Sequence, residues 1–129
     1  MYKRNWKLYV EDVLECIKKV EKYTGDMEFT LFEKDDKTVD AVIKNLETIG
    51  EAAGHIPDDI KARHKYIPWG EIVGLRNRIV HGYFNIDLKI IWGVIKEELP
   101  ALKIQLEHIL KEEHDNHVSR QGRDQRAQK

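Results

Sequence analysis

Hydrophobic positions along the chain recur at steps of three and four residues, which is the period of an amphipathic α-helix. The pattern runs first from Trp6 to Val20 and stops at Gly25, and it resumes from about Lys37 to Ala53. No stretch shows the sustained alternation of a strand, so we predict an all-α protein. The apolar residues of these two helices are Trp6, Val10, Val13, Leu14, Ile17 and Val20, and then Val39, Val42, Ile43, Leu46, Ile49 and Ala53.

The end of the second predicted helix has little side-chain volume. Residues 50–54 read Gly-Glu-Ala-Ala-Gly, and small residues let another helix approach closely. A short helix is predicted to begin near Pro57 and to reach about Lys65. Ile67-Pro68-Trp69 then opens a further helix, which we expect to run without interruption to Gly82.

The last long helix is predicted to begin at Asp87, a favourable N-cap. Its apolar residues stay in phase across Pro100, which indicates a kinked helix or two nearly collinear helices. They are Leu88, Ile91, Trp92, Ile95, Leu99, Leu102, Leu106 and Ile109. Beyond about His114 the apolar residues run out, and residues 117–129 contain four basic residues and one acidic residue. We therefore expect a helical bundle of four to five helices over residues 1–113 and a flexible basic tail over residues 114–129.

Length, charge and cysteine content limit the classes of protein that fit. A chain of 129 residues forms one domain, and its net charge of -1 provides no general attraction for a polyanion. The lone cysteine, Cys16, rules out an internal disulfide, and its helical setting favours a small buried apolar residue. The N-terminal residues are not followed by an unbroken apolar run, so we expect no signal peptide or membrane span and a cytoplasmic protein.

The segment 69–83 holds the candidate chemistry. At 100° per residue, Arg76 lies about 20° from the direction of Trp69 and so within an apolar stripe, whereas Arg78 points to the opposite side. A charged side chain on a core-facing stripe needs a partner, which marks Arg76 as a candidate functional residue and Arg78 as a solvent-exposed one. The apolar residues of this stripe are Trp69, Ile72, Val73, Ile79 and Val80.

His81 lies on the flank of the same predicted helix, about one turn after Asn77, so the two side chains can contact each other. Histidine titrates near neutral pH and can act as a base or an acid, while arginine binds phosphate oxygens in pairs. Asn77 could orient the ring of His81 or a phosphate. By spacing alone, the same pattern fits a helix–helix contact with one hydrogen-bonded arginine and a capping histidine.

The identities of the residues in this segment carry more information than their spacing alone. Residues 76–83 read Arg-Asn-Arg-Ile-Val-His-Gly-Tyr, and they resemble the Arg-x4-His-x-Tyr signature of the HepT-type toxins of the HEPN superfamily. The resemblance extends in order from about Val39 to Ile109. The other similar segments are residues 45–53, 67–69, 83–87 and 92–100.

The resemblance implies a fold, an activity and partners. The fold is an up-and-down helical bundle that forms a homodimer about a two-fold axis. The activity is RNA cleavage, transfer RNA included, without metal or other cofactor, with Arg76 and His81 catalytic and Asn77 supporting in a composite site at the dimer interface. The resemblance also implies the toxin of a type VII toxin–antitoxin system, which a cognate nucleotidyltransferase antitoxin neutralises by transferring AMP to Tyr83.

Two other functions compete with the nuclease. One is a non-catalytic HEPN-like dimer that binds a nucleotide or the nucleotidyltransferase. The other is a structural helical dimer, which leaves Arg76 unexplained.

Other charged groups have two interpretations. The cluster Lys61, Arg63, His64 and Lys65 is either an RNA-backbone contact or a solvated helix face. Glu47 and Glu51 either pair with Arg76 or are ordinary surface carboxylates. His114 and His117 lie three apart without a carboxylate or cysteine set around them, so we expect no metal site.

Overall fold

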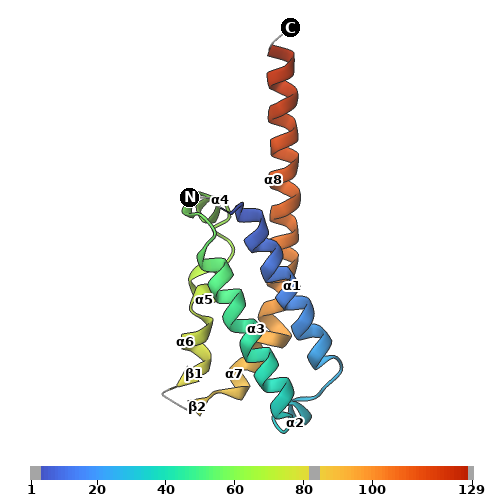
Figure 1. Cartoon of the computed structure of the whole chain (residues 1–129), viewed down its shortest axis with the longest axis vertical. Coiled ribbons are helices and arrows are strands. Elements are labelled where there is room, and N and C mark those ends of the chain that lie inside the picture. The colour runs from blue at the N-terminus through green and yellow to red at the C-terminus, as the bar shows by residue number, and fades with distance from the viewer. Residues whose placement is uncertain (1–3, 82–84, 128–129) are drawn as a thin grey trace.

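The computed structural model of the chain describes the backbone of residues 4–81 and 85–127 and the side chains of residues 4–79 and 85–113. Helices make up nearly all the regular structure of these residues, and the prediction of an all-α helical bundle is confirmed. Figure 1 shows the helices side by side, with the last one extending well beyond the others.

The first two long helices, α1 (Trp6–Thr24) and α3 (Asp36–Gly54), pack against each other and run in opposite directions (Figure 1). Local sequence sets their ends. The side chains of Asn5 and Asp35 accept hydrogen bonds from first-turn amides, as N-caps do, and Gly25 ends α1 with a φ of 47°. The connector between them contains the single turn α2 (Phe29–Phe32).

The middle of the chain is built from short elements: α4 (Asp58–Arg63), α5 (Trp69–Val73), α6 (Leu75–Ile79), β1 (Val80–His81) and β2 (Asn85–Ile86). The prediction of one uninterrupted helix from Trp69 to Gly82 is therefore wrong. Gly74 forms a turn whose amide bonds to the carbonyl of Gly70 at 3.0 Å, and this turn separates α5 from α6.

The chain then leaves the helix after Ile79. β1 and β2 pair in antiparallel register, with Val80 opposite Ile86 and His81 opposite Asn85. The carbonyl of Ile79 accepts a hydrogen bond from the amide of Asp87 at 2.9 Å. These cross-strand partners take the place of the next helical hydrogen bonds, and this is the physical reason that α6 ends where it does.

The C-terminal helices are α7 (Leu88–Gly93), the π-helix η1 (Val94–Glu98) and α8 (Leu99–Ala127). The N-cap prediction for Asp87 is confirmed, because its carboxylate accepts from the amides of Lys89 and Ile90. The three helices follow one another directly, and the wider turns of η1 lie just before Pro100, which has no amide hydrogen to donate. The predicted kinked helix or pair of nearly collinear helices is thus a succession of two α-helices joined by a π-helix.

Residues 114–127 continue α8 as helical backbone that extends beyond the bundle (Figure 1). Because this segment has no apolar periodicity, a helix was not predicted there. Its flexibility, and its separation from the bundle as a distinct region, stay predictions.

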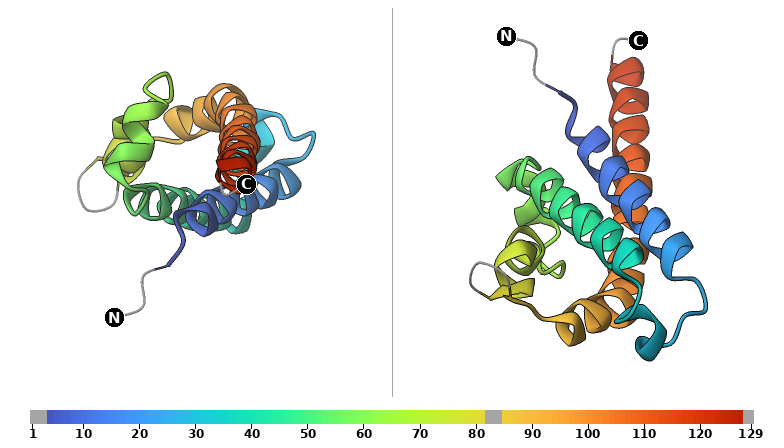
Figure 2. Two further views of the ribbon diagram at one scale, coloured as in Figure 1. Left: turned by 90° about the horizontal axis from the view of Figure 1, so that it is seen from above. Right: turned by 60° about the horizontal axis from the view of Figure 1, so that its bottom comes forward.

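The core lies between α1, α3, the α5–α6 segment and the α7–α8 segment, which surround it when the molecule is viewed from above (Figure 2). Gly50 allows the close approach of α5 to α3, because a Cβ atom on this residue would lie 3.1 Å from the carbonyl oxygen of Ile72. The prediction that the small residues at the end of α3 admit another helix is thus confirmed. None of the helices, as far as their residues are described, is long and apolar enough to cross a membrane.

Candidate functional site

The short helix α6 carries two of the predicted site residues on its exposed side. Leu75 and Ile79 are buried against the core, whereas Arg76 and Asn77 are exposed. The prediction that Arg76 lies on a core-facing stripe is therefore wrong. The buried side of α5 and α6 consists of Ile72, Leu75 and Ile79, which follow steps of three and four, and Val73 is 43% exposed.

The exposed guanidinium of Arg76 has no hydrogen-bond or ion-pair partner among the described residues. Its donors are available to an incoming anion, and a guanidinium binds phosphate oxygens in pairs. Asn77, the next residue, adds an exposed amide on the same turn. The structure thus places a guanidinium and an amide group on one turn at the surface.

Arg78 does not point freely into solvent, as its helical phase predicted. Its Nη1 and Nη2 atoms donate to Oε1 and Oε2 of Glu98 on η1, at 2.7 and 2.8 Å. These hydrogen bonds raise the pKa of Arg78 above its usual value. The core face is centred near Leu75 and not near Trp69, and this difference places Arg78 on the flank of the helix, beside η1.

The sequence contains a signal for Glu98 that we did not use. Glu98 stands three residues after Ile95 and four before Leu102, both of which are buried. It therefore lies at the edge of the apolar face of the helix, where its side chain is 40% exposed. A charge at this position of the repeat is the sequence signal that could have pointed to the ion pair with Arg78.

His81 lies in β1, two residues after the end of α6. Its backbone pairs with Asn85 in a strand and is not helical. The side chain of His81 lies outside the described residues, as does all of Tyr83. In Figure 1, α6, β1 and β2 lie together at the same end of the molecule, which brings the backbone of His81 close to the helix of Arg76.

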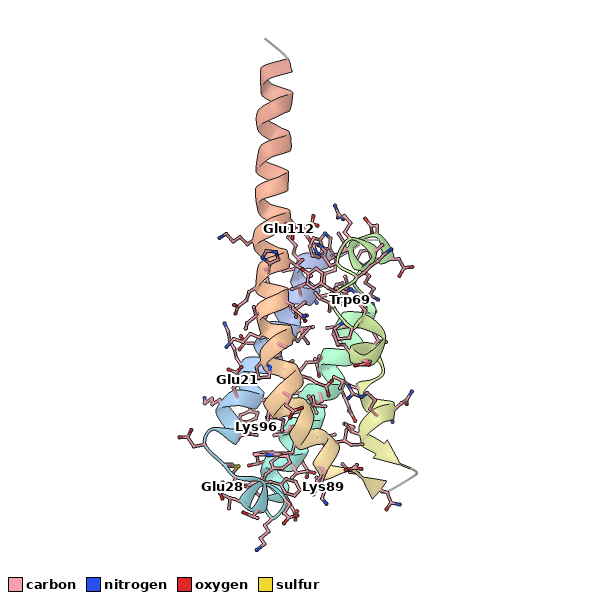
Figure 3. All side chains as sticks on the ribbon, turned by 180° about the vertical axis from the view of Figure 1, so that it is seen from behind. Glu21, Glu28, Trp69, Lys89, Lys96 and Glu112 are labelled. Atoms are coloured by element: carbon pink, nitrogen blue, oxygen red, sulfur yellow. The ribbon has the colours of Figure 1, made fainter. Side chains whose placement is uncertain are left out.

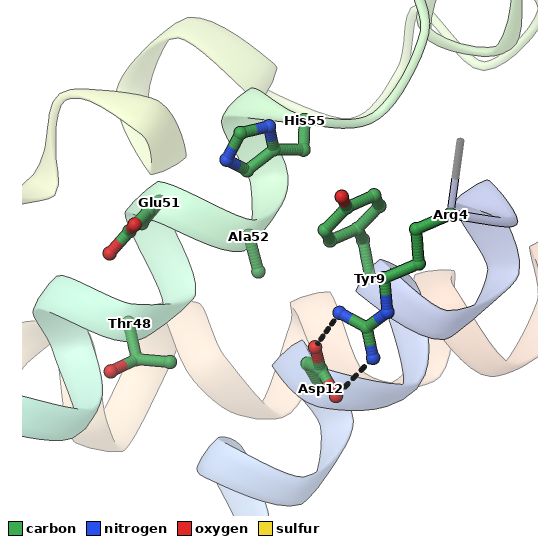
Figure 4. Close-up of a pocket in the computed structure, with 7 residues that line it drawn as sticks. All are labelled: Arg4, Tyr9, Asp12, Thr48, Glu51, Ala52 and His55. Carbon is green, nitrogen blue, oxygen red and sulfur yellow. Dashed lines mark hydrogen bonds and ion pairs between the residues drawn. The ribbon is translucent and has the colours of Figure 1, made fainter. Parts of the chain in front are cut away.

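Glu47 and Glu51 are exposed, and neither forms an ion pair with Arg76 in the described part of the chain. Glu51 borders a cavity of about 260 Å³ between α1 and α3 (Figure 4). Arg4 and Asp12 form an ion pair at 2.6 Å there, and Tyr9 stacks on His55 with ring centres 5.0 Å apart. Among the residues whose side chains are described, none from α6 lines this cavity, so these observations favour ordinary surface carboxylates over a role beside Arg76.

Part of the basic cluster at residues 61–65 has a structural role. The ring of His64 is buried, and its Nε2 lies 3.1 Å from Oε1 of Glu113 on α8. Arg63 approaches the same carboxylate at 3.4 Å, and the indole of Trp69 donates to the carbonyl of His64. The interpretation of His64 as an RNA contact is therefore wrong, since the cluster joins the end of α4 to α8.

Cys16 and the histidines complete the list of reactive side chains. Cys16 is buried in α1, as predicted, and burial raises the pKa of its thiol. Wherever side chains are described, no three histidine, cysteine, aspartate or glutamate residues lie close enough to hold a metal ion. His114 and His117 lie outside those residues.

The comparisons with known proteins agree on one family. The sequence profile of the family described as ribonuclease HepT-like matches residues 13–109. The chain is 42% identical over 109 residues to a probable ribonuclease HepT of Thermococcus cleftensis, which covers 84% of this chain and 99% of that protein. No solved structure shows a significant match.

Other relatives agree. A putative RNase of Methanocaldococcus jannaschii is 37% identical over 87% of this chain and 93% of its own. A putative RNase of Caldanaerobacter subterraneus subsp. tengcongensis is 38% identical over 81% of this chain and 94% of its own. The chain is a member of the HepT-like ribonuclease family.

Proposed function

We propose that this protein is a ribonuclease that cleaves RNA through Arg76 and His81, with Asn77 in a supporting role. The observation that carries the proposal is the state of Arg76, which is exposed and has no partner among the described residues. An exposed guanidinium without a protein partner is suited to bind the phosphodiester backbone of RNA. The family, whose members include probable and putative ribonucleases, supports the same activity.

The proposed reaction is an internal transesterification. The 2′-hydroxyl of RNA attacks the neighbouring phosphorus while His81 takes its proton as general base. The bond from phosphorus to the 5′-oxygen breaks, and this oxygen leaves with a proton from an acid. The products are a 2′,3′-cyclic phosphate and a 5′-hydroxyl. Arg76 stabilises the extra negative charge on the phosphorus oxygens in the transition state.

We propose that the working form is a homodimer with a composite site. The exposed side of α5 and α6 presents Val73 beside Arg76 and Asn77, which is a mixture of apolar and polar groups suited to a contact between subunits. A two-fold axis near this surface would bring two copies of the motif into one cleft. Arg76 of one subunit and His81 of the other would then face the same phosphate, so that the dimer holds two equivalent sites.

The regulation that we propose is that of a toxin–antitoxin pair acting in the cytoplasm, with transfer RNA among the substrates. A cognate nucleotidyltransferase would transfer AMP from ATP to the hydroxyl oxygen of Tyr83, two residues after His81, with release of pyrophosphate and of the hydroxyl proton. The added phosphate would carry negative charge to the site and compete with RNA for Arg76. Inhibition in this form needs no change of conformation.

The nuclease proposal is tested with Arg76→Ala and His81→Ala, with Lys44→Ala as the control because Lys44 is an exposed cation on α3. Loss of Arg76 should slow RNA cleavage by about 10² to 10³-fold, and loss of His81 by about 10² to 10⁴-fold. Because Arg76 is exposed, its removal should change the free energy of unfolding by less than about 0.5 kcal/mol. Lys44→Ala should cleave like the wild type.

The RNA cleavage assay also tests whether the reaction depends on metal and which ends it leaves. Cleavage should persist in EDTA and leave 2′,3′-cyclic phosphate ends. Activity that EDTA abolishes and a divalent ion restores would place the reaction in the metal-dependent class. Wild-type protein that binds RNA without cutting it would contradict the nuclease and favour the binding module.

A further inference from the structure

The helix α6 is too short to hold its own position. It contains five residues, from Leu75 to Ile79, and it lies between the turn at Gly74 and the strand β1. Isolated helices of this length are unstable in water, so contacts with the rest of the protein must fix its orientation. This orientation decides where the side chain of Arg76 points.

Contacts with β2, with the core and with η1 fix α6. At its C-terminal end, the carbonyl of Ile79 accepts a hydrogen bond from the amide of Asp87 just after β2. On one side, Leu75 and Ile79 are 2% and 0% exposed, and their apolar burial draws the helix onto the core without a preferred direction. On another side, Arg78 makes two parallel hydrogen bonds to Glu98. A bidentate pair of this kind is directional, because both distances change when either partner rotates or shifts.

We propose that Glu98 is a positioning residue of the ribonuclease site, which holds α6 through Arg78 so that Arg76 presents its guanidinium to the RNA phosphate. The inference rests on the proposed function. Arg78 is two residues from Arg76 on the same turn, so a rotation of α6 moves both side chains together. Glu98 touches no substrate and acts only through Arg78.

Buried neighbours fix the backbone of Glu98. It is the last residue of η1, and its neighbours along the core-facing side, Ile95 and Leu99, are 6% and 2% exposed. π-Helical turns occur frequently at functional sites. In this protein, the π-turn ends on the carboxylate that meets Arg78, so the irregular helix and the site are linked by one ion pair.

The exposure of the pair separates a positioning role from a stabilising one. The side chains of Arg78 and Glu98 are 32% and 40% exposed, and ion pairs exposed to this degree contribute little to stability. Removal of the pair should therefore affect cleavage far more than unfolding. If the pair only stabilised the fold, its removal would affect unfolding more than cleavage.

The test compares Glu98→Ala and Arg78→Ala with Glu21→Ala. Glu21 on α1 pairs with Lys103 at 3.2 Å, the two side chains are 43% and 30% exposed, and Figure 3 shows Glu21 away from α6. The control thus removes an equally exposed pair from another part of the bundle. The measurements are kcat and KM on one RNA substrate, the melting temperature, and amide hydrogen exchange of residues 75–81.

Both variants of the pair should lower kcat by about tenfold or more with KM within about twofold, because a misplaced group loses transition-state contacts. Exchange should rise in residues 75–81 and stay unchanged in α1 and α3, at nearly constant melting temperature. Glu21→Ala should match the wild type in every measurement. The swapped pair, Arg78→Glu with Glu98→Arg, should recover part of the kcat that Arg78→Glu loses.

Two outcomes would overturn the inference. If Glu98→Ala cleaves like the wild type while Arg78→Ala is slow, Arg78 contacts RNA directly and needs no positioning. If Glu98→Ala melts early and exchanges faster throughout the bundle, the pair is merely structural.

The exchange measurement keeps the inference separate from the proposed function. Wild-type protein that fails to cleave RNA would contradict the proposed function. In that case, a rise in exchange confined to residues 75–81 in Glu98→Ala still supports the anchoring of α6, and unchanged exchange overturns it.

Discussion

Two arginines on one helical turn have different surroundings, and the difference assigns their roles. Arg78 uses two of its donors on Glu98, whereas Arg76 has no partner among the described residues. A guanidinium has five N–H donors in a fixed plane. Arg76 can therefore bind a phosphate without first losing a protein contact, while Arg78 would have to leave Glu98.

The proposed regulation depends on one hydroxyl group, that of Tyr83. The phenol is not needed for the proton transfers assigned to His81 or for the charge of Arg76. Tyr83→Phe should therefore keep most of the ribonuclease activity and accept no AMP. When the wild-type chain is incubated with its nucleotidyltransferase and ATP, its mass should rise by one AMP group on the peptide that contains Tyr83, as measured by mass spectrometry.

The matched control for Tyr83→Phe is the unmodified complex. Binding of the nucleotidyltransferase could silence the nuclease by itself, so the complex without ATP is assayed for cleavage separately. In the cell, Tyr83→Phe should arrest growth even when the antitoxin is co-expressed. Modification at another residue, or neutralisation of Tyr83→Phe without stable binding, would contradict the role given to this tyrosine.

At the scale of elements, the approach of α5 to α3 depends on Gly50. A Cβ atom at this position would lie 3.1 Å from the carbonyl oxygen of Ile72 and 3.2 Å from that of Val73. Gly50→Ala should therefore push α5 away and lower the free energy of unfolding by about 1–3 kcal/mol, as chemical denaturation would measure. Cleavage should also fall, because α5 leads directly into α6.

Gly93→Ala is the control for this substitution. Gly93 has helical dihedral angles, and a Cβ atom there would meet nothing within 4 Å. The alanine should leave stability unchanged or raise it by about 0.5–1 kcal/mol, since it restricts the unfolded chain. Equal losses of stability in the two variants would show that crowding at Gly50 is not the cause.

The sequence predicted those parts of the fold whose causes are local. Asp87 begins a helix because its own carboxylate bonds to amides two and three residues ahead, and Gly25 ends one through its own backbone conformation. The end of α6 has no such local cause. It depends on the pairing of Val80 with Ile86, and single-helix periodicity contains no information about that partner.

The candidate site shows the same limit. The motif residues were found from their spacing and resemblance, but the surroundings of Arg76 and Arg78 were assigned the wrong way round. The helical phase was centred on Trp69, whereas the buried side is centred near Leu75, and the partner of Arg78 lies twenty residues away on η1. Contacts at that separation follow from how the helices pack, so a pattern within one helix cannot supply them.

At the scale of the whole molecule, a single chain supplies only half of the composite site that we propose. The prediction is that the protein is a dimer in solution, by light scattering, and that each site takes Arg76 from one subunit and His81 from the other. In a mixed dimer of Arg76→Ala with His81→Ala chains, one of the two sites is then intact. Each variant alone has no intact site.

A one-to-one mixture of the two variants, unfolded and refolded together, should therefore recover about a quarter of the wild-type rate, because half of the dimers are mixed and each has one working site. The control mixture pairs Arg76→Ala with the double variant Arg76→Ala/His81→Ala, which cannot form an intact site in any arrangement. It should stay inactive at the same protein concentration. If mass spectrometry shows that mixed dimers of the first two variants form and they still fail to cleave, each site lies within one subunit, and the exposed face of α6 meets RNA without help from a second chain.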